Sequence, residues 1–210
     1  MPWDSTKGSI VKPDKQEIEE LQEKILKAIG RNVLILQKME GMLKSLVVVA
    51  NSKFPTGNLE SAVRKRQMAV SKMPMGRLVN HFVRSVHPNG GENARREETS
   101  AKGSFEFSFT FEDGAVVEEL EASLRMVVEE RNQLIHTKLI DFDPKSLESC
   151  RDLAGDLEDQ RQRIKPQFEA LAAICATVRD GYKVLTDNFG SVQFEGDSRI
   201  AANRGQEADE

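Results

Sequence analysis

The sequence is poor in the residues that build disulfide frameworks, zinc sites and β-rich cores. Its 210 residues include two Cys, three His, one Trp and one Tyr, and aromatic residues make up 6% of the chain. So few and scattered Cys and His exclude a disulfide scaffold and a structural zinc site. Cys150 has no histidine near it in sequence, which favours a buried, inert thiol over a nucleophile. The small aromatic share, with abundant Leu, Val, Glu, Lys and Arg, favours helices over a β-sandwich or barrel.

Long apolar segments are also missing. Apolar runs such as Leu46–Ala50 are far shorter than the roughly 20 residues that a membrane-spanning helix needs. The first residues lack the apolar stretch behind a basic one that marks a signal peptide. We therefore expect a soluble, cytoplasmic protein without membrane contacts. Its net charge of −4 provides no general attraction to nucleic acid.

What the sequence does contain is apolar residues at helical spacing over most of its length. The predicted helices cover about residues 15–51, 59–72, 75–86, 115–139 and 144–188. Gly30 interrupts the first of them, and a helix of that length would span about 55 Å, so we expect a kink or two helices there. The last two helices predict an αα-hairpin. Together the helices predict a mainly α fold, an antiparallel bundle of four to five helices.

A phenylalanine at every second position interrupts this helical pattern within residues 104–111. This period is typical of a strand with one apolar face and predicts a short extended or β-hairpin insertion. One strand is not stable alone, so we expect it to pair with the preceding loop or with another copy of the chain, or to pack as an extended segment.

Polar and Gly-rich segments predict the domain boundaries. Residues 1–14 predict a flexible N-terminal tail, and residues 189–210 predict a disordered C-terminal tail. Between them we expect one helical domain over residues 15–188, with a mobile loop and the extended insertion at about 87–114.

The most specific local signal runs from Glu130 to His136, near the end of the predicted helix over residues 115–139. Arg131 is followed by the polar Asn132, and His136 lies five positions after the arginine. This segment resembles the Arg-x4–6-His motif of the HEPN superfamily (higher eukaryotes and prokaryotes nucleotide-binding domains). Two further segments are similar to parts of bacterial HEPN proteins: Gln37–Lys44, with a Glu-x-x-Leu-Lys pattern, and Met73–Val79.

The resemblance implies a helical domain that works as a homodimer, with two copies of the motif facing each other in a cleft. Many HEPN proteins are metal-independent ribonucleases of toxin–antitoxin or anti-phage systems, so it implies no cofactor, no metal ion, RNA as substrate, and an antitoxin or regulatory partner. In such a site Arg131 would hold the scissile phosphate, and His136 would act as general base or acid. Asn132 would orient the histidine or the phosphate.

Helix geometry alone does not bring the motif together. Arg131 and His136 are five residues apart and lie about 140° apart on an α-helix, whereas Asn132 and His136 share a face. A long arginine side chain or a frayed last turn would have to close this gap. The alternative interpretation is an ordinary helix end whose basic residues interact with the helix dipole, with Glu129 or Glu130 paired on the surface. The protein would then be a non-catalytic helical dimerisation or interaction module with a regulatory or RNA-binding role.

Charge is unevenly distributed along the chain. The segment from Glu60 to Lys102 contains nine Lys or Arg and four Glu, a net charge of +5. The predicted helix over residues 115–139 is, in contrast, acidic. A basic segment can follow a phosphate backbone, although aromatic residues interleaved for base stacking are missing, and a solvated helix face is the other interpretation. The predicted RNA-binding residues are Arg64, Lys65, Arg66, Arg77, Arg95 and Arg96.

Overall fold

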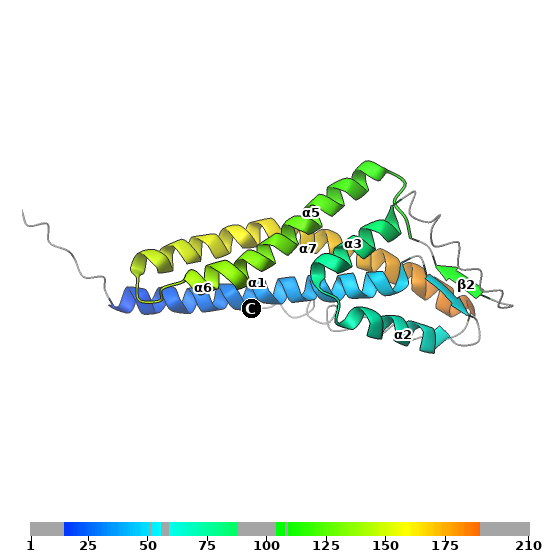
Figure 1. The fold of residues 1–210 in the computed structure, drawn as a ribbon, viewed down its shortest axis with the longest axis horizontal. Helices are drawn as coiled ribbons and strands as arrows, with labels where there is room; N and C mark the ends of the chain where they lie inside the picture. The colour runs from blue at the N-terminus through cyan, green and yellow to red at the C-terminus, as the bar shows by residue number, and fades with distance from the viewer. Residues whose placement is uncertain (1–14, 51, 56–58, 88–103, 108, 190–210) are drawn as a thin grey trace, which may run out of the picture.

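The computed structural model describes residues 15–50, 52–55, 59–87, 104–107 and 109–189, and they form an elongated, mainly helical molecule (Figure 1). Three helices supply most of its length: α1 (Lys15–Val49), α5 (Gly114–Gln133) and α7 (Leu147–Phe189). Two shorter helices, α2 (Leu59–Ser71) and α3 (Met75–Val86), lie at the wider end. The mainly helical class predicted from sequence is confirmed.

The first helix is not divided. The segment predicted as a kinked helix or two helices is one continuous helix of 35 residues, so the two-helix alternative is wrong. Gly30 is exposed, and nothing lies within 4 Å of the position that its Cβ would take. A glycine inside a helix costs about 1 kcal/mol relative to alanine, and the packing of α1 on α7 offsets this cost.

α1 and α7 run in the same direction. Ion pairs join Glu17 to Arg151 near their N-termini and Arg31 to Glu158 further along, so residue numbers rise together in the two helices. Figure 1 shows both helices extending from the narrow end toward the wide end. The predicted antiparallel arrangement is therefore wrong for this pair, because the chain crosses the molecule once more between them, through α5.

α5 and α7 form the predicted αα-hairpin. Lys138, just beyond α5, is 2.8 Å from Asp156 of α7, and Glu130 of α5 forms an ion pair with Arg163. Numbers fall along α5 as they rise along α7, so the two helices are antiparallel. The turn between them follows a short last helical turn, α6 (Leu139–Asp141).

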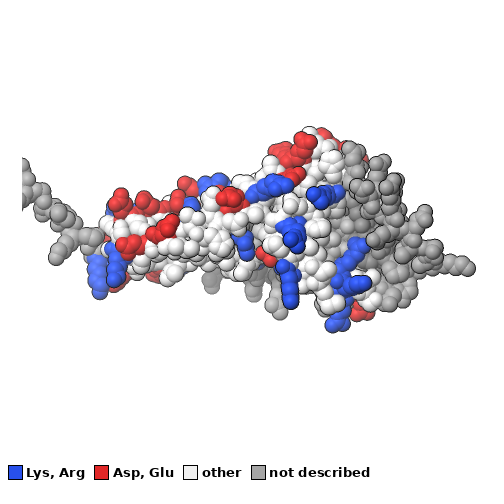
Figure 2. All heavy atoms as spheres, viewed as in Figure 1, with Lys and Arg blue, Asp and Glu red and all other residues white. Residues whose placement is uncertain are grey.

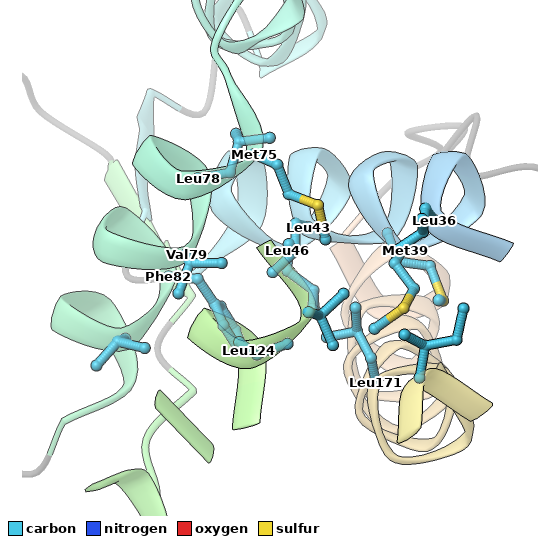
Figure 3. Close-up of a cluster of buried hydrophobic side chains, with 14 of the residues drawn as sticks. Leu36, Met39, Leu43, Leu46, Met75, Leu78, Val79, Phe82, Leu124 and Leu171 are labelled. Atoms are coloured by element: carbon cyan, nitrogen blue, oxygen red, sulfur yellow. The ribbon is translucent and has the colours of Figure 1, made fainter. Parts of the chain in front are cut away.

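The core of the wider end lies where α1, α3, α5 and α7 meet (Figure 3). α3 is strongly amphipathic, and its apolar residues recur at intervals of three and four, which gives one buried face. Phe82 is fully buried there, near Leu46 of α1 and Leu124 of α5. The buried residues of α3 are Met75, Leu78, Val79, Phe82, Val83 and Val86.

The two segments similar to bacterial HEPN proteins, Gln37–Lys44 and Met73–Val79, contribute to this core. Most of their long apolar side chains are buried, Met73 is half-buried, and within the first segment Lys44 forms an ion pair of 2.8 Å with Glu40. Packing therefore accounts for these two patterns. The buried members are Met39, Met42, Leu43, Met75, Leu78 and Val79.

The strand predicted within residues 104–111 has an unexpected partner. β2 (Ser104–Phe107) pairs in antiparallel register with β1 (Ser52–Pro55), which follows α1. A local β-hairpin within 104–111 is thus wrong, because the hydrogen-bonding partner comes from the connection between α1 and α2. Phe107 then packs edge-on against Tyr182 of α7, with ring centroids 6.0 Å apart.

Several predicted segments lie outside the described residues. They are the N-terminal tail 1–14, nearly all of the C-terminal tail 189–210, and most of the predicted mobile loop, residues 88–103.

Candidate functional site

The segment that contains His136 is not a regular α-helix. After α5 ends at Gln133, residues Leu134–Lys138 form a π-turn, η1, in which the N–H of Leu139 donates to the carbonyl oxygen of Leu134, five residues earlier. The predicted helix over 115–139 is therefore continuous as a helical rod but widens near its end. Single π-turns within helices occur frequently at functional sites.

The π-turn changes which side chains share a face. Bonds between residues i and i+5 place more residues in each turn, so residues five apart come closer in angle than in an α-helix. Leu134 is fully buried and Leu139 packs against the core, whereas Ile135 and Ile140 are both exposed. Leu134 and Leu139, five residues apart, therefore face the core. Ile135 and Ile140, also five residues apart, face solvent.

The same widening affects the motif. His136 lies within the π-turn and Arg131 lies three residues before it, so the angle between them is smaller than the α-helical value. The helical rod continues to Asp141, so His136 does not lie in a frayed last turn. Arg131 and Asn132 are half-buried and His136 is exposed. Among the residues that the structure describes, no side-chain hydrogen bond or ion pair occupies any of the three.

Glu130, directly before the motif, is buried rather than paired on the surface as the alternative interpretation predicted. Its carboxylate accepts hydrogen bonds from the Arg163 guanidinium and from the Gln160 amide, the latter at 3.3 Å. The hydrogen bond and charge of Glu130 raise the pKa of Arg163 above its ordinary value. Glu129 does lie on the surface, where it accepts from Gln133 at 3.1 Å. The side chain of Glu130, next to the motif, thus belongs to the contact between α5 and α7.

A polar chain connects α1, α7 and α5; its members Asn32, Gln160 and Glu130 are buried, and the exposed Arg163 ends it. Asn32 and Gln160 are both fully buried. The Asn32 amide donates to Gln160 Oε1 at 3.0 Å and to the carbonyl oxygen of Leu157 at 2.8 Å. Gln160 Nε2 in turn donates to the backbone carbonyl of Glu130 at 2.9 Å. Because Asn32 occupies the amide oxygen of Gln160, the amide nitrogen must face Glu130.

The sequence analysis missed this polar chain. Asn32 and Gln160 stand at positions of the apolar stripes of α1 and α7 that otherwise hold residues such as Leu36 and Ile164. A polar residue on an apolar stripe must find a hydrogen-bond partner inside the protein. A polar residue on each apolar stripe was therefore the signal in the sequence. The hydrogen-bond partners are identified only by the packing of the three helices.

The predicted RNA-binding residues are partly described. Arg64, Lys65 and Arg77 are exposed, Arg66 is half-buried, and Arg95 and Arg96 lie outside the described residues. In Figure 2, most of the visible basic side chains lie over the wider end, which includes α2 and α3, whereas acidic side chains are frequent along the narrow end. The described part of the basic segment, residues 60–87, therefore contributes to this basic region of the surface.

Arg77 lies on a helix that approaches the motif. A Cβ on Gly76, the residue before it, would lie 3.6 Å from Val128 Cγ1 of α5. Val128 precedes Arg131 by three positions and Asn132 by four, and such residues are neighbours on one helix face. The start of α3, with Arg77, therefore lies next to the part of α5 that contains the arginine and asparagine of the motif.

Both cysteines are poor nucleophiles. Burial raises the pKa of the Cys150 thiol, and it raises that of Cys175 to about 12. We expect both thiols of the native protein to react slowly with a disulfide reagent at pH 8, because the thiolate is the reactive form. Unfolding in denaturant should release two rapidly reacting thiols. A thiol that reacts at once in the native protein, followed by absorbance after mixing, would contradict the buried position of Cys150 or the half-buried position of Cys175.

Within the described ranges, no group of three or more His, Cys, Asp or Glu is arranged to hold a metal ion. None of the described helices combines the length and the apolar character needed to cross a membrane.

Comparison of the chain with family models, curated proteins and solved structures gave no match. The HEPN resemblance therefore stays a prediction from the motif residues of the sequence.

Proposed function

We propose that this protein is a HEPN-like, metal-independent endoribonuclease. The observation that carries the proposal is the arrangement of Arg131, Asn132 and His136 around a π-turn, with no intramolecular hydrogen bond or ion pair occupying their side chains among the described residues. Their neighbour Glu130 is, by contrast, buried and fully engaged. Three polar groups without a partner among the described residues, beside a tightly bonded Glu130, are suited to bind a ligand.

The three side chains match the needs of RNA cleavage. The planar guanidinium of Arg131 can bind the scissile phosphate and stabilise the charge that develops on its oxygens. His136 can take the proton from the 2′-hydroxyl, whose oxygen then attacks phosphorus, or give a proton to the departing 5′-oxygen. Asn132, four residues before His136, can orient the imidazole or the phosphate.

A homodimer would complete the reaction. One histidine can perform one of the two proton transfers at a time, and a second copy of the motif across a two-fold axis would supply the other. Arg77 and the exposed basic residues of α2 would bind the RNA backbone on either side of the cleaved bond. A toxin or defence effector held in check by an antitoxin is the biological role that we propose for this activity.

The alternative is a non-catalytic dimerisation or interaction module with a regulatory or RNA-binding role. It is favoured by the exposed apolar side chains next to the motif, Ile135 and Ile140, the second of which is 71% exposed. Apolar side chains in contact with solvent are typical of interaction surfaces when they occur together. The two functions differ in one result, because a module of this kind binds RNA or itself and leaves the RNA intact.

RNA cleavage in EDTA tests the proposal. The wild-type protein should cut a mixed-sequence RNA in EDTA, and Arg131→Ala should lower kcat/KM by about 10²–10³-fold, as expected for losing one charge-stabilising donor. Arg179→Ala, at an exposed arginine on α7, is the matched control and should cleave like wild type. Intact RNA after incubation with the wild type would contradict the proposed ribonuclease activity. Cleavage by Arg131→Ala at the wild-type rate would contradict the proposed role of Arg131 in it.

A further inference from the structure

α7 holds the π-turn segment at two points. Before the turn, Gln160 Nε2 donates to the carbonyl oxygen of Glu130 at 2.9 Å and to its Oε2 at 3.3 Å. At the end of the turn, Lys138 Nζ lies 2.8 Å from Asp156 Oδ2. Asp156 and Gln160 are four residues apart and therefore neighbours on one face of α7. This face fixes both ends of the segment that contains Arg131, Asn132 and His136.

The Gln160 bond lies where the helix changes its geometry. The N–H of Leu134 is shared between the carbonyls of Arg131 and Glu130, so the regular bond to Glu130 is divided. A carbonyl oxygen has two lone pairs, and Gln160 binds the oxygen of Glu130 from outside the helix. A side chain that satisfies a carbonyl in this way lowers the free-energy cost of departing from α-helical bonding in the next turn.

Gln160 is itself held in one orientation. It is fully buried, and Asn32 donates to its amide oxygen at 3.0 Å. Arg163 occupies the other carboxylate oxygen of Glu130. A buried polar group with all its partners in place has one low-energy arrangement, so this contact can define a position closely.

We propose that Gln160 is a positioning residue of the candidate site: by binding Glu130 it maintains the π-turn and thereby sets His136 relative to Arg131 and Asn132. It does not touch the RNA. The effect on cleavage rests on the proposed function, whereas the effect on the π-turn does not. The two can therefore fail separately.

The test compares two variants of the same polar chain. Gln160→Met keeps the length and burial of the side chain and removes both bonds to Glu130. Asn32→Ala, the matched control, removes bonds from the far side of Gln160 and leaves Glu130 engaged. Both should lower thermal stability, since each leaves a buried polar group without its partner. Stability alone therefore does not separate a positioning role from a purely structural one.

Hydrogen exchange and NMR separate the two roles. In Gln160→Met the amides of Lys138 and Leu139, which belong to the π-turn, should exchange at least about ten-fold faster relative to the amide of Leu124. The imidazole resonances of His136 should shift. Asn32→Ala removes only a support of Gln160 and keeps its bond to Glu130, so the exchange ratio and these resonances should change less than in Gln160→Met. Unchanged values in Gln160→Met, or equal changes in both variants, would overturn the proposal.

Activity provides a second measurement. If the wild type cleaves RNA, Gln160→Met should lose kcat by up to about 10²-fold with KM little changed, because a misplaced histidine slows the chemistry without removing the phosphate contacts. Equal kcat in Gln160→Met and Asn32→Ala would overturn the positioning role. Wild-type protein that leaves RNA intact would contradict the proposed function, and the exchange ratio would still decide the role of Gln160.

A conservative variant covers the case in which Gln160→Met does not fold. Gln160→Glu keeps the shape of the side chain, and places a carboxyl group against the Glu130 carboxylate. Protonated, the new carboxyl can donate one bond to Glu130, and ionised it can donate none. Compared with wild type at the same pH, Lys138 and Leu139 should exchange faster, and this difference should shrink as the pH is lowered toward 5. Exchange at the wild-type rate across this range would overturn the proposal.

Discussion

Replacing His136 with alanine is expected to lower the rate of RNA cleavage by about 10²–10⁴-fold, the contribution usual for a general acid–base group. The folded protein should tolerate the change, because His136 is exposed and no hydrogen bond or ion pair within the described residues depends on it. Cleavage measured by gel electrophoresis, with Tm measured on the same samples, checks both expectations.

His81 provides the matched control for this experiment. It is also an exposed histidine, and it lies on α3 outside the motif, so His81→Ala should cleave RNA like wild type. A similar loss of rate in both variants, or none in His136→Ala, would show that the cleavage does not depend on this residue.

The largest effect on stability is expected from Phe82→Ala. Phe82 is fully buried where α1, α3 and α5 meet, among side chains that Figure 3 shows pointing toward it. Removing its ring loses burial and leaves a cavity, which costs about 3–5 kcal/mol. For a protein of this size the Tm should fall by roughly 10 °C, as followed by circular dichroism during heating.

Leu26→Ala shows whether burial is the cause. Leu26 lies on α1 and is 69% exposed, so the truncation should change the free energy of unfolding by less than about 0.5 kcal/mol. If Leu26→Ala destabilises the protein as much as Phe82→Ala, a surface that is exposed in one chain must be buried in solution. That result would point to self-association through α1.

The helices were largely predictable because their signal is local. The apolar periodicity of α3 and the helix-starting position of Pro74 place its boundaries where the structure has them, from Met75 to Val86. The same reasoning is wrong for α1 in one respect, because Gly30 predicts a kink or two helices and the segment is a single helix. One glycine costs about 1 kcal/mol, and burial of side chains such as Leu36 and Leu43 on both sides outweighs it.

The partners of the elements were not predictable from local pattern. The alternation of phenylalanines indicates an extended segment but does not show which strand it pairs with. The structure shows that this strand is β1. The parallel packing of α1 and α7 likewise depends on where the intervening chain runs. Periodicity defines which face of an element is apolar, and many elements could cover that face.

The sequence by itself determined the mainly helical class, most helix boundaries and the motif residues Arg131, Asn132 and His136, because spacing and residue type are properties of the chain. Only the tertiary structure decided the surroundings of that motif. A regular helix would separate Arg131 from His136 by about 140°, and the π-turn reduces this angle. That turn is accompanied by contacts from α7, with Gln160 bonded to Glu130 and Asp156 to Lys138. Such contacts join residues far apart in sequence, and they form only when three helices pack together.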